Sequence, residues 1–280
     1  MKLTLSDSQN RIKSEANEFA REHLEQLASE LDAKGTFPAK IIELAAEKGY
    51  MGIAVPRENG GWGADYVSYV AMIEEISRYC ASTGVILSVN NSLVCEPLME
   101  FGTDEQKENF LKPLAYGQKL GCFALTEANA GSDCGKTKTT AKADGDNWII
   151  TGSKMFITCG TAADIAIVFA LTSPDVGSRG ISAFLVETDS PGFSAKHIPS
   201  KMGIKASGLA ELVLEDVKVP GKNILGPENK GFKVAMKTLD AGRIGIAAQA
   251  VGIAKGAFEE TISIPPLYRL KALQLRFLQP

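Results

Sequence analysis

The hydrophobic period of the sequence changes twice along the chain, and these two changes limit the possible folds. Apolar residues recur every three or four positions up to about residue 118, alternate with polar residues over 119–226, and return to the helical period over 227–260. The first period is typical of amphipathic helices and the second of strands. The pattern predicts an α+β multidomain fold with an N-terminal helical bundle, a middle β-barrel domain and the start of a C-terminal helical domain.

Local signals support the helical domain over residues 1–118. Ser6 stands three residues before Gln9 in a capping box, and an amphipathic helix follows it. A second helix is expected from Pro38 to Gly49, and a third begins after Asp65.

Short strands separated by Gly, Pro, Asp and Ser are expected over residues 119–226, in a barrel or sandwich. The segments are KTKTTAKA, WIITGSKMFIT, IAIVFAL, GISAFLVE, FSAKHIP and ELVLEDVKV, with the turn DGDN between the first two.

A helix rich in small residues is predicted over 227–260, where glycines at 242, 245, 252 and 256 align on one face. Small residues allow close helix contact, so this helix is predicted to be one arm of a bundle. We expect its small-residue face to lack the helices that should cover it, which leaves an apolar patch and favours aggregation.

The tail over residues 261–280 differs in composition from the rest of the chain. It contains Arg269, Lys271 and Arg276 but no acidic residue, although the chain holds 33 Asp and Glu residues. Pro265-Pro266 also interrupts the helical pattern. These features predict an aberrant tail from a frameshifted or otherwise truncated copy, which resequencing of the gene would test.

Composition excludes several classes of protein. The net charge of −3 and the absence of a cluster of basic and aromatic residues argue against nucleic-acid binding. The start MKLTLSDSQ does not resemble a signal peptide, and no apolar run reaches the roughly 18 residues of a membrane span. The five cysteines form no C-x-x-C pair and only two histidines are present, so we expect reduced core thiols, no zinc and a cytoplasmic protein without a membrane partner.

The segment ALTEANAGSDCGK, residues 124–136, is the strongest candidate for a binding loop. It offers the hydroxyls of Thr126 and Ser132, the backbone freedom of Gly131 and a run of backbone amides, which suit a ligand with ring and phosphate parts. Each of these residue types is also common in ordinary turns, so a simple connector is the alternative.

Four segments in this order resemble the acyl-CoA dehydrogenase family over residues 1–260. They are FGTDEQKENFLKPLAYG, ALTEANAGSDCGK, GSKMFITCG and LDAGRIGIAAQAVGIA, and the last resembles the short-chain, butyryl-CoA dehydrogenase branch. The resemblance implies FAD-dependent α,β-dehydrogenation of short-chain acyl-CoA thioesters to trans-2-enoyl-CoA, as in fatty acid β-oxidation. It also implies an electron-transferring flavoprotein as acceptor and a homotetramer, and it implies that most of the C-terminal helical domain is missing from this chain.

The same resemblance assigns binding roles to two segments of the β domain. Thr126 and Thr158 match hydroxyls that contact the flavin ring, Phe156 matches an aromatic that stacks on it, and Ser132 lies beside the pyrophosphate and the CoA moiety. Asp133 is interpreted mainly as a carboxylate that holds the turn. The full set expected to bind the cofactor is Phe123, Ala124, Leu125, Thr126, Gly131, Ser132, Phe156, Ile157 and Thr158.

Asp240 and Arg243 match the family segment that borders the CoA chain, and with Ser132 they are the expected substrate contacts. A surface ion pair at i,i+3 is the alternative for Asp240 and Arg243. The catalytic base of the short-chain branch is a glutamate whose position is expected beyond residue 280. Other branches carry the base immediately before the arginine, where this chain has Gly242.

Two other functions compete with dehydrogenation. One is a non-catalytic fragment that binds FAD or CoA esters weakly, because no base is recognised in the chain. The other is a flavin oxidase or monooxygenase of the same superfamily, against which LDAGRIGIAAQAVGIA argues.

Overall fold

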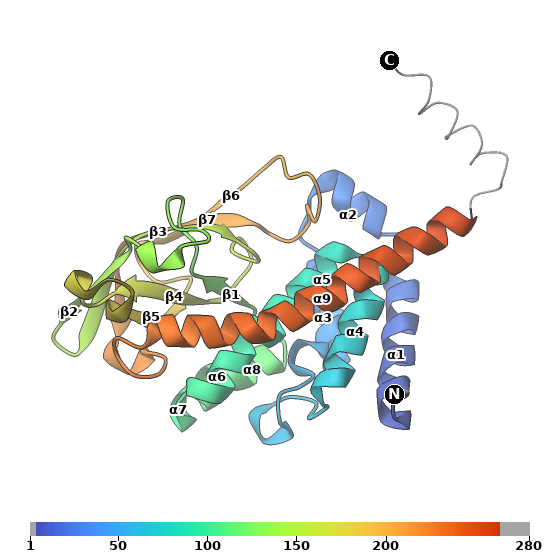
Figure 1. Cartoon of the computed structure of the whole chain (residues 1–280), viewed down its shortest axis with the longest axis horizontal. Helices are drawn as coiled ribbons and strands as arrows, with labels where there is room; N and C mark the ends of the chain where they lie inside the picture. Colours follow the sequence, from blue (N-terminus) through green and yellow to red (C-terminus); the bar gives the residue numbers. More distant parts are fainter. Residues whose placement is uncertain (1–3, 264–280) are drawn as a thin grey trace, which may run out of the picture.

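The computed structural model describes residues 4–263, which form a helical domain, a β domain and one long helix (Figure 1). This order confirms the predicted fold class. The expected tail features, including Pro265 and Pro266, lie outside the described residues. In the part of the chain that the structure describes, no helix combines the length and apolarity that a bilayer crossing requires.

The helical domain packs apolar faces of short helices against one another. Ser6 caps the first helix through the predicted capping box with Gln9, and Asp65 caps the fourth by accepting a hydrogen bond from the backbone N–H of Ser68. The α-helices are α1 Asp7–His23, α2 Ala28–Lys34, α3 Ala39–Glu47, α4 Tyr66–Tyr79, α5 Ala81–Ser88, α6 Glu96–Phe101, α7 Asp104–Gln106 and α8 Lys112–Ala115. The 3-10 turns are η1 Tyr50–Gly52 and η2 Arg57–Asn59, and the π-helical segments are η3 Val89–Cys95 and η4 Lys107–Leu111.

One curled sheet of seven strands forms the β domain, in the order β1-β4-β2-β3-β7-β6 with β5 paired to β4. β1 and β4 are parallel, whereas β4 and β5, β2 and β3, β3 and β7, and β6 and β7 are antiparallel. The strands are β1 Gly121–Ala124, β2 Thr140–Asp144, β3 Asn147–Ile157, β4 Ile165–Leu171, β5 Ile181–Glu187, β6 Phe193–His197 and β7 Ala210–Pro220. The 3-10 turn η5 Cys134–Lys136 lies between β1 and β2, η6 Pro174–Gly180 lies between β4 and β5, and η7 Gly221–Asn223 follows β7.

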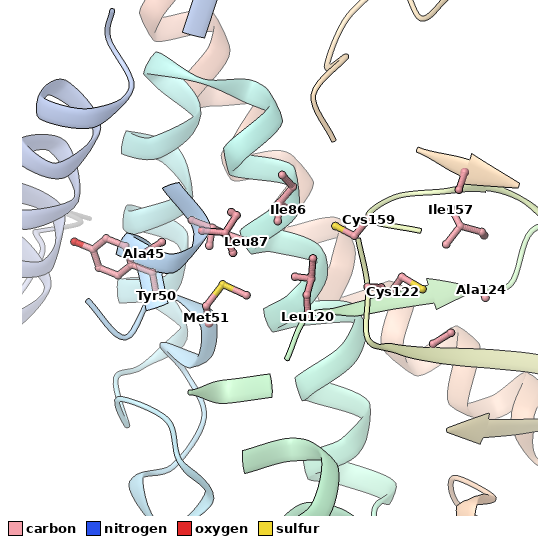
Figure 2. Close-up of a cluster of buried hydrophobic side chains, with 14 of the residues drawn as sticks. Ala45, Tyr50, Met51, Ile86, Leu87, Leu120, Cys122, Ala124, Ile157 and Cys159 are labelled. Atoms are coloured by element: carbon pink, nitrogen blue, oxygen red, sulfur yellow. The ribbon is translucent and has the colours of Figure 1, made fainter. Parts of the chain in front are cut away.

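Both faces of β4 are buried, which explains its unbroken apolar sequence IAIVFAL. Ala166 and Val168 face a core shared with the helical domain, whereas Ile167 and Phe169 face a second core under α6 and the long helix. Figure 2 shows the first core running from Tyr50 and other helical-domain side chains to residues of the β domain. The helical and β domains therefore share a continuous apolar interior.

The long helix α9, Gly231–Ser263, lies across the helical domain and reaches the β domain at its first turns (Figure 1). Its glycines approach α4 and α5 closely: a Cβ at Gly245 would lie 2.2 Å from the Tyr69 hydroxyl oxygen, and one at Gly252 would lie 2.2 Å from the Glu74 carbonyl oxygen. The prediction that this small-residue face lacks covering helices is wrong, because the helical domain covers it.

α9 also exposes large apolar side chains outside its contact with α4. Its side chains are Ile244, Ile246, Val251, Ile253, Phe258 and Ile262, each 40% exposed or more. We call these six residues the α9 apolar face. Apolar side chains are therefore exposed on this helix, but they are not the small-residue face for which an apolar patch was expected.

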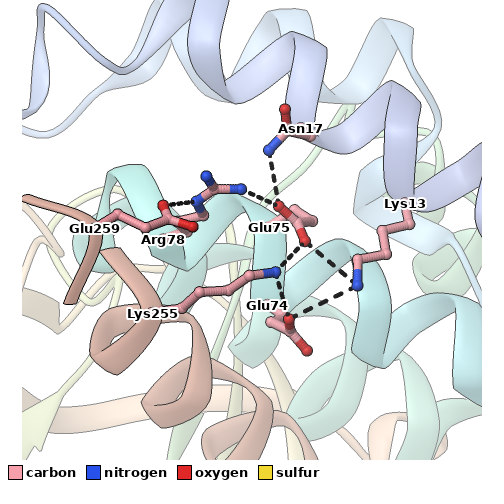
Figure 3. Close-up of polar contacts among 7 residues, drawn as sticks. All are labelled: Lys13, Asn17, Glu74, Glu75, Arg78, Lys255 and Glu259. Carbon is pink, nitrogen blue, oxygen red and sulfur yellow. Dashed lines mark hydrogen bonds and ion pairs between the residues drawn. The ribbon is translucent and has the colours of Figure 1, made fainter. Parts of the chain in front are cut away.

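A buried carboxylate joins three helices (Figure 3). Glu75 of α4 is 2% exposed and accepts hydrogen bonds from Asn17 of α1 at 2.8 Å and from Lys255 of α9 at 2.9 Å. Arg78 of α4 forms ion pairs with Glu75 at 3.2 Å and with Glu259 of α9 at 2.5 Å, and these residues together form the Glu75 cluster. Burial alone raises the pKa of Glu75, but these donors outweigh burial and lower it. The cluster fixes the position of α9 on α1 and α4.

Candidate functional site

A cavity of about 480 Å³ lies where the loop after β1, the end of β3, η3 and the first turns of α9 meet. The structure brings eight of the residues expected to bind ligands to this one place. They are Phe123, Leu125, Thr126, Gly131, Ser132, Phe156, Thr158 and Arg243.

Three of the expected binding residues do not line the cavity. Ala124 and Ile157 are buried in the shared apolar core, where Figure 2 shows them beside Cys122. On β1 the pleat sends Ala124 to the core and its neighbour Phe123 to the cavity. Asp240 forms an exposed ion pair with Arg243 at i,i+3, which was the alternative for this pair, while Arg243 also reaches the cavity wall.

Phe156 presents an aromatic ring to the cavity from an unusual backbone position. Its φ is 60°, which non-glycine residues rarely adopt, and its side chain is 60% exposed although it belongs to β3. The pairing of β3 with β7 shifts register between Lys154 and Ile157. Phe156 lies inside this irregularity and has no register partner on β7, and strained positions of this kind are concentrated at binding sites.

Three residues with hydroxyl groups line the cavity: Thr126, Ser132 and Thr158. Within residues 4–263 none of the three hydroxyls forms a hydrogen bond to another protein group. A Cβ at Gly131 would meet no atom within 4 Å, so the loop is open next to Ser132. The wall therefore combines polar groups able to bind a ligand with one exposed aromatic face.

The apolar walls from η3 and α9 were not predicted from the sequence. Val89 and Leu93 come from η3, and Phe232, Met236 and Leu239 come from α9. Buried Asn90 holds η3 in place: its side chain donates to the Met51 carbonyl at 2.8 Å and accepts from the Gly121 N–H at 3.1 Å. The one sequence feature that indicated this packing was the pair Asn90-Asn91 inside an apolar run. Amide side chains in a buried helix need hydrogen-bond partners, which implies a second element packed against them.

A second missed feature lies directly behind the binding loop. Lys154 is fully buried and its Nζ lies 2.8 Å from the Glu127 carboxylate, which is also buried. The inward position of a lysine on β3 was the available signal, because a buried ammonium requires a buried acceptor. Burial lowers the pKa of Lys154 to about 8, and Glu127 opposes this shift.

A further cavity of about 490 Å³ adjoins the first and shares Leu93, Leu239 and Arg243 with it. Its other lining residues, Gly242, Ile246, Ala247 and Ala250, all come from α9. The lining is apolar apart from Arg243, so one end of the combined space is polar and aromatic and the other end suits a hydrocarbon.

Metals and disulfides have no candidate site in the described chain. Residues 4–263 contain no group of three or more His, Cys, Asp or Glu side chains placed to hold a metal ion. All five cysteines are buried with free thiols, which confirms the prediction of core thiols.

Comparison with known proteins assigns a family to this arrangement. Three descriptions match in order: "Acyl-CoA dehydrogenase, N-terminal domain" over residues 6–118, the middle domain over 122–217 and the C-terminal domain over 229–264. The short-chain specific acyl-CoA dehydrogenase of Clostridium acetobutylicum is 47% identical over 260 residues, which cover 93% of this chain and 69% of that protein. The mitochondrial short-chain specific enzyme of Homo sapiens is 42% identical, and the match covers 98% of this chain and 68% of that protein.

Solved structures show the same relationship. Butyryl-CoA dehydrogenase from Megasphaera elsdenii superposes with a TM-score of 0.91 at 44% identity, over 94% of this chain and 70% of that chain. A chain from work on the electron transferring flavoprotein of Acidaminococcus fermentans superposes with a TM-score of 0.92 at 46% identity, over 94% of this chain and 69% of that chain. The chain therefore belongs to the acyl-CoA dehydrogenase family and resembles its short-chain, butyryl-CoA branch.

Proposed function

We propose that this chain binds FAD and a short-chain acyl-CoA thioester for α,β-dehydrogenation to trans-2-enoyl-CoA. The proposal rests on one observation: a single cavity is lined by Thr126, Ser132, Phe156 and Thr158, with Arg243 beside them. These side chains come from segments up to about a hundred residues apart, and they combine the aromatic and polar contacts that a flavin nucleotide requires.

The residues present fit FAD on the grounds of their chemistry. The exposed ring of Phe156 offers a flat face for stacking, and the hydroxyls of Thr126 and Thr158 can bond the polar edges of the flavin. Ser132 and the open backbone at Gly131 can bond the pyrophosphate. When bound, FAD supplies the hydride acceptor of the reaction. The protein walls orient the ligands and exclude water.

The two adjoining cavities suit the two ends of an acyl-CoA. The apolar space along α9 can hold a short acyl chain, while the guanidinium of Arg243 can attract the CoA phosphates. Asp240 holds Arg243 through their ion pair on one face of α9, so we assign Asp240 a role in orienting Arg243.

We infer that the catalytic base comes from a segment outside the described residues. Asp133 is the only carboxylate among the described residues that line the first cavity, and it is exposed and bonded to Lys136 at 2.9 Å. The position next to Arg243 is Gly242, which has no side chain to accept a proton. Substrate dehydrogenation by this chain alone is therefore expected to be impaired.

The family relationship also supports partners. We propose an electron-transferring flavoprotein as the electron acceptor, since a chain from work on such a flavoprotein is among the similar structures. A homotetramer and a cytoplasmic location are likewise proposed. The five buried free thiols are consistent with a reducing compartment.

Titration of the 280-residue chain with FAD tests the site, with quenching of flavin fluorescence as the readout. We expect the Phe156→Ala variant to bind FAD about tenfold more weakly, because the stacking face is removed while the positive-φ backbone is kept. Phe258→Ala removes a similarly exposed ring that lies near the C-terminal end of α9 and does not line the cavity, so FAD affinity should be unchanged. Equal affinities for the parent chain and Phe156→Ala would refute the proposed flavin site.

A second function, binding without catalysis, is favoured by the lack of a suitable carboxylate in the described cavity walls. Anaerobic addition of butyryl-CoA to the FAD-loaded chain distinguishes the two. For binding alone we expect a perturbed flavin spectrum without bleaching. Rapid bleaching that Asp133→Asn abolishes would place the base in this loop and overturn our inference about the base.

A further inference from the structure

We propose that Glu127 and Lys154 act together as a positioning device for the binding loop: Glu127 closes the loop at its base, and Lys154 orients the peptide that presents Thr126 to the cavity. The inference rests on the proposed function only in taking FAD as the ligand of this loop. Neither residue touches the ligand space itself, because neither lines the cavity.

Glu127 bonds the two ends of the loop to each other. Its carboxylate accepts hydrogen bonds from the backbone N–H of Lys138 at 2.7 Å, the N–H of Thr139 at 3.0 Å and the Thr139 hydroxyl at 2.7 Å, and also from the Thr137 hydroxyl. The segment 128–136 between these ends carries Gly131 and Ser132. Closing its base limits the conformations available to the loop and so reduces the entropy lost when a ligand binds.

Lys154 acts on the peptide unit that precedes Thr126. Its Nζ donates to the Leu125 carbonyl at 3.2 Å, to Glu127 at 2.8 Å and to the Thr137 hydroxyl at 3.0 Å, so the three donors of the ammonium are all used. The described chain has no cis peptide bond. The Thr126 N–H therefore points opposite to the Leu125 carbonyl, away from buried Lys154.

The direction of the Thr126 N–H matters because this N–H and the Thr126 hydroxyl are the groups left to bind a ligand. Its carbonyl accepts a hydrogen bond from the Met155 N–H at 2.8 Å, whereas its N–H and hydroxyl have no hydrogen-bond partner within residues 4–263. Lys154 and Met155, neighbours on β3, thus hold the two carbonyls on either side of the Thr126 N–H. The N–H and hydroxyl are then free to bond a ligand in the cavity.

The packing around the pair is tight enough to hold this geometry. Lys154 is 0% and Glu127 5% exposed. A Cβ at Gly152 would lie 2.5 Å from the Thr139 hydroxyl oxygen, so glycine on β3 leaves the room that Thr139 uses to reach Glu127. A buried pair with every donor and acceptor satisfied favours one arrangement of the groups it holds.

A double variant separates positioning from stability. Lys154→Met alone leaves a buried carboxylate without its partner and is expected to destabilise the chain strongly, whereas Glu127→Gln with Lys154→Met removes both charges and retains most of the volume. We expect the double variant to melt within a few degrees of the parent. Its Lys138 and Thr139 amides should exchange hydrogen at least about tenfold faster, and FAD should bind about tenfold more weakly.

Two controls match this design. Lys136→Met removes an exposed ion pair to Asp133 in the same loop and should alter neither amide exchange nor FAD affinity. Ile150→Ala destabilises β3 from the apolar core and should leave the FAD affinity of the folded protein within about twofold.

Parent-like exchange and FAD affinity in the double variant would overturn the proposal. If the parent itself does not bind FAD, the proposed function fails. Amide exchange at Lys138 and Thr139 in the FAD-free chain still decides whether the pair orders the loop.

Discussion

Single residues set the chemistry of the cavity through contacts outside it. Phe156 reaches the cavity because the β3–β7 register shifts beside it, and Thr126 faces the cavity because Lys154 and Met155 bond the flanking carbonyls. The residues that meet the ligand are thus oriented by groups that a ligand never contacts.

The Glu127 carboxylate gives this arrangement a pH dependence. Burial alone raises its pKa, but the charge of Lys154, with hydrogen bonds from Lys154, Thr137 and the Lys138 N–H, lowers it to about 2 from an ordinary value of 4.5. Because the pKa is lower in the folded state, the stabilisation is complete above pH 4.5 and is lost as the pH falls toward 2.

We therefore expect the difference in free energy of unfolding between the parent and Glu127→Gln to be largest above pH 4.5 and to shrink at lower pH. Urea denaturation of both proteins at several pH values measures this difference. A difference that stays constant down to pH 2.5 would contradict the ionised, paired state of Glu127.

At the scale of elements, the close packing of α9 on α4 decides how the helical parts fit together. Glycine allows the backbones to approach, and the buried Glu75 cluster holds the same pair of helices by polar contacts (Figure 3). Leu239 and Arg243 of α9 line the cavity, so this contact also positions one of its walls.

Gly252→Ala tests the close approach. The added methyl group would lie 2.2 Å from the Glu74 carbonyl oxygen, which belongs to the backbone of a buried helix and cannot easily move. We expect a loss of about 1–3 kcal/mol in the free energy of unfolding, although alanine is favoured over glycine in helices by about 1 kcal/mol.

Ala254→Gly on the exposed side of α9 is the matched control for this experiment. It should show only the propensity effect, a loss of about 1 kcal/mol. If Gly252→Ala instead stabilises the chain by a similar amount, α9 does not pack on α4 as described.

At the scale of the whole molecule, the α9 apolar face is the feature most able to bring two chains together. Six large apolar side chains of one helix are exposed, and Figure 1 shows α9 lying on the outside of the helical domain. Exposed apolar surface of this kind favours association. Among the described residues nothing covers this face. Self-association of the chain through it is the expected consequence.

Light scattering coupled to gel filtration measures this behaviour. We expect the parent chain to self-associate at tens of micromolar, and the triple variant Ile246→Gln, Ile253→Gln, Phe258→Gln to shift toward monomer. The control Val67→Gln, Val176→Gln, Met202→Gln changes three apolar side chains that are exposed elsewhere and should behave like the parent. Equal shifts in both triple variants would show that no specific face is involved.

The sequence alone determined the order of helical and β domains, the capping of α1 and α4, and the two β-domain segments that meet at the cavity. These properties depend on local periods, caps and short motifs, which are written within a few neighbouring residues. Tertiary structure decided which face of α9 is covered and that Ala124 and Ile157 face the core. It also brought Lys154 to Glu127, which is 27 positions away in the chain. These outcomes depend on strand register and on contacts between distant segments, and a local pattern does not contain that information.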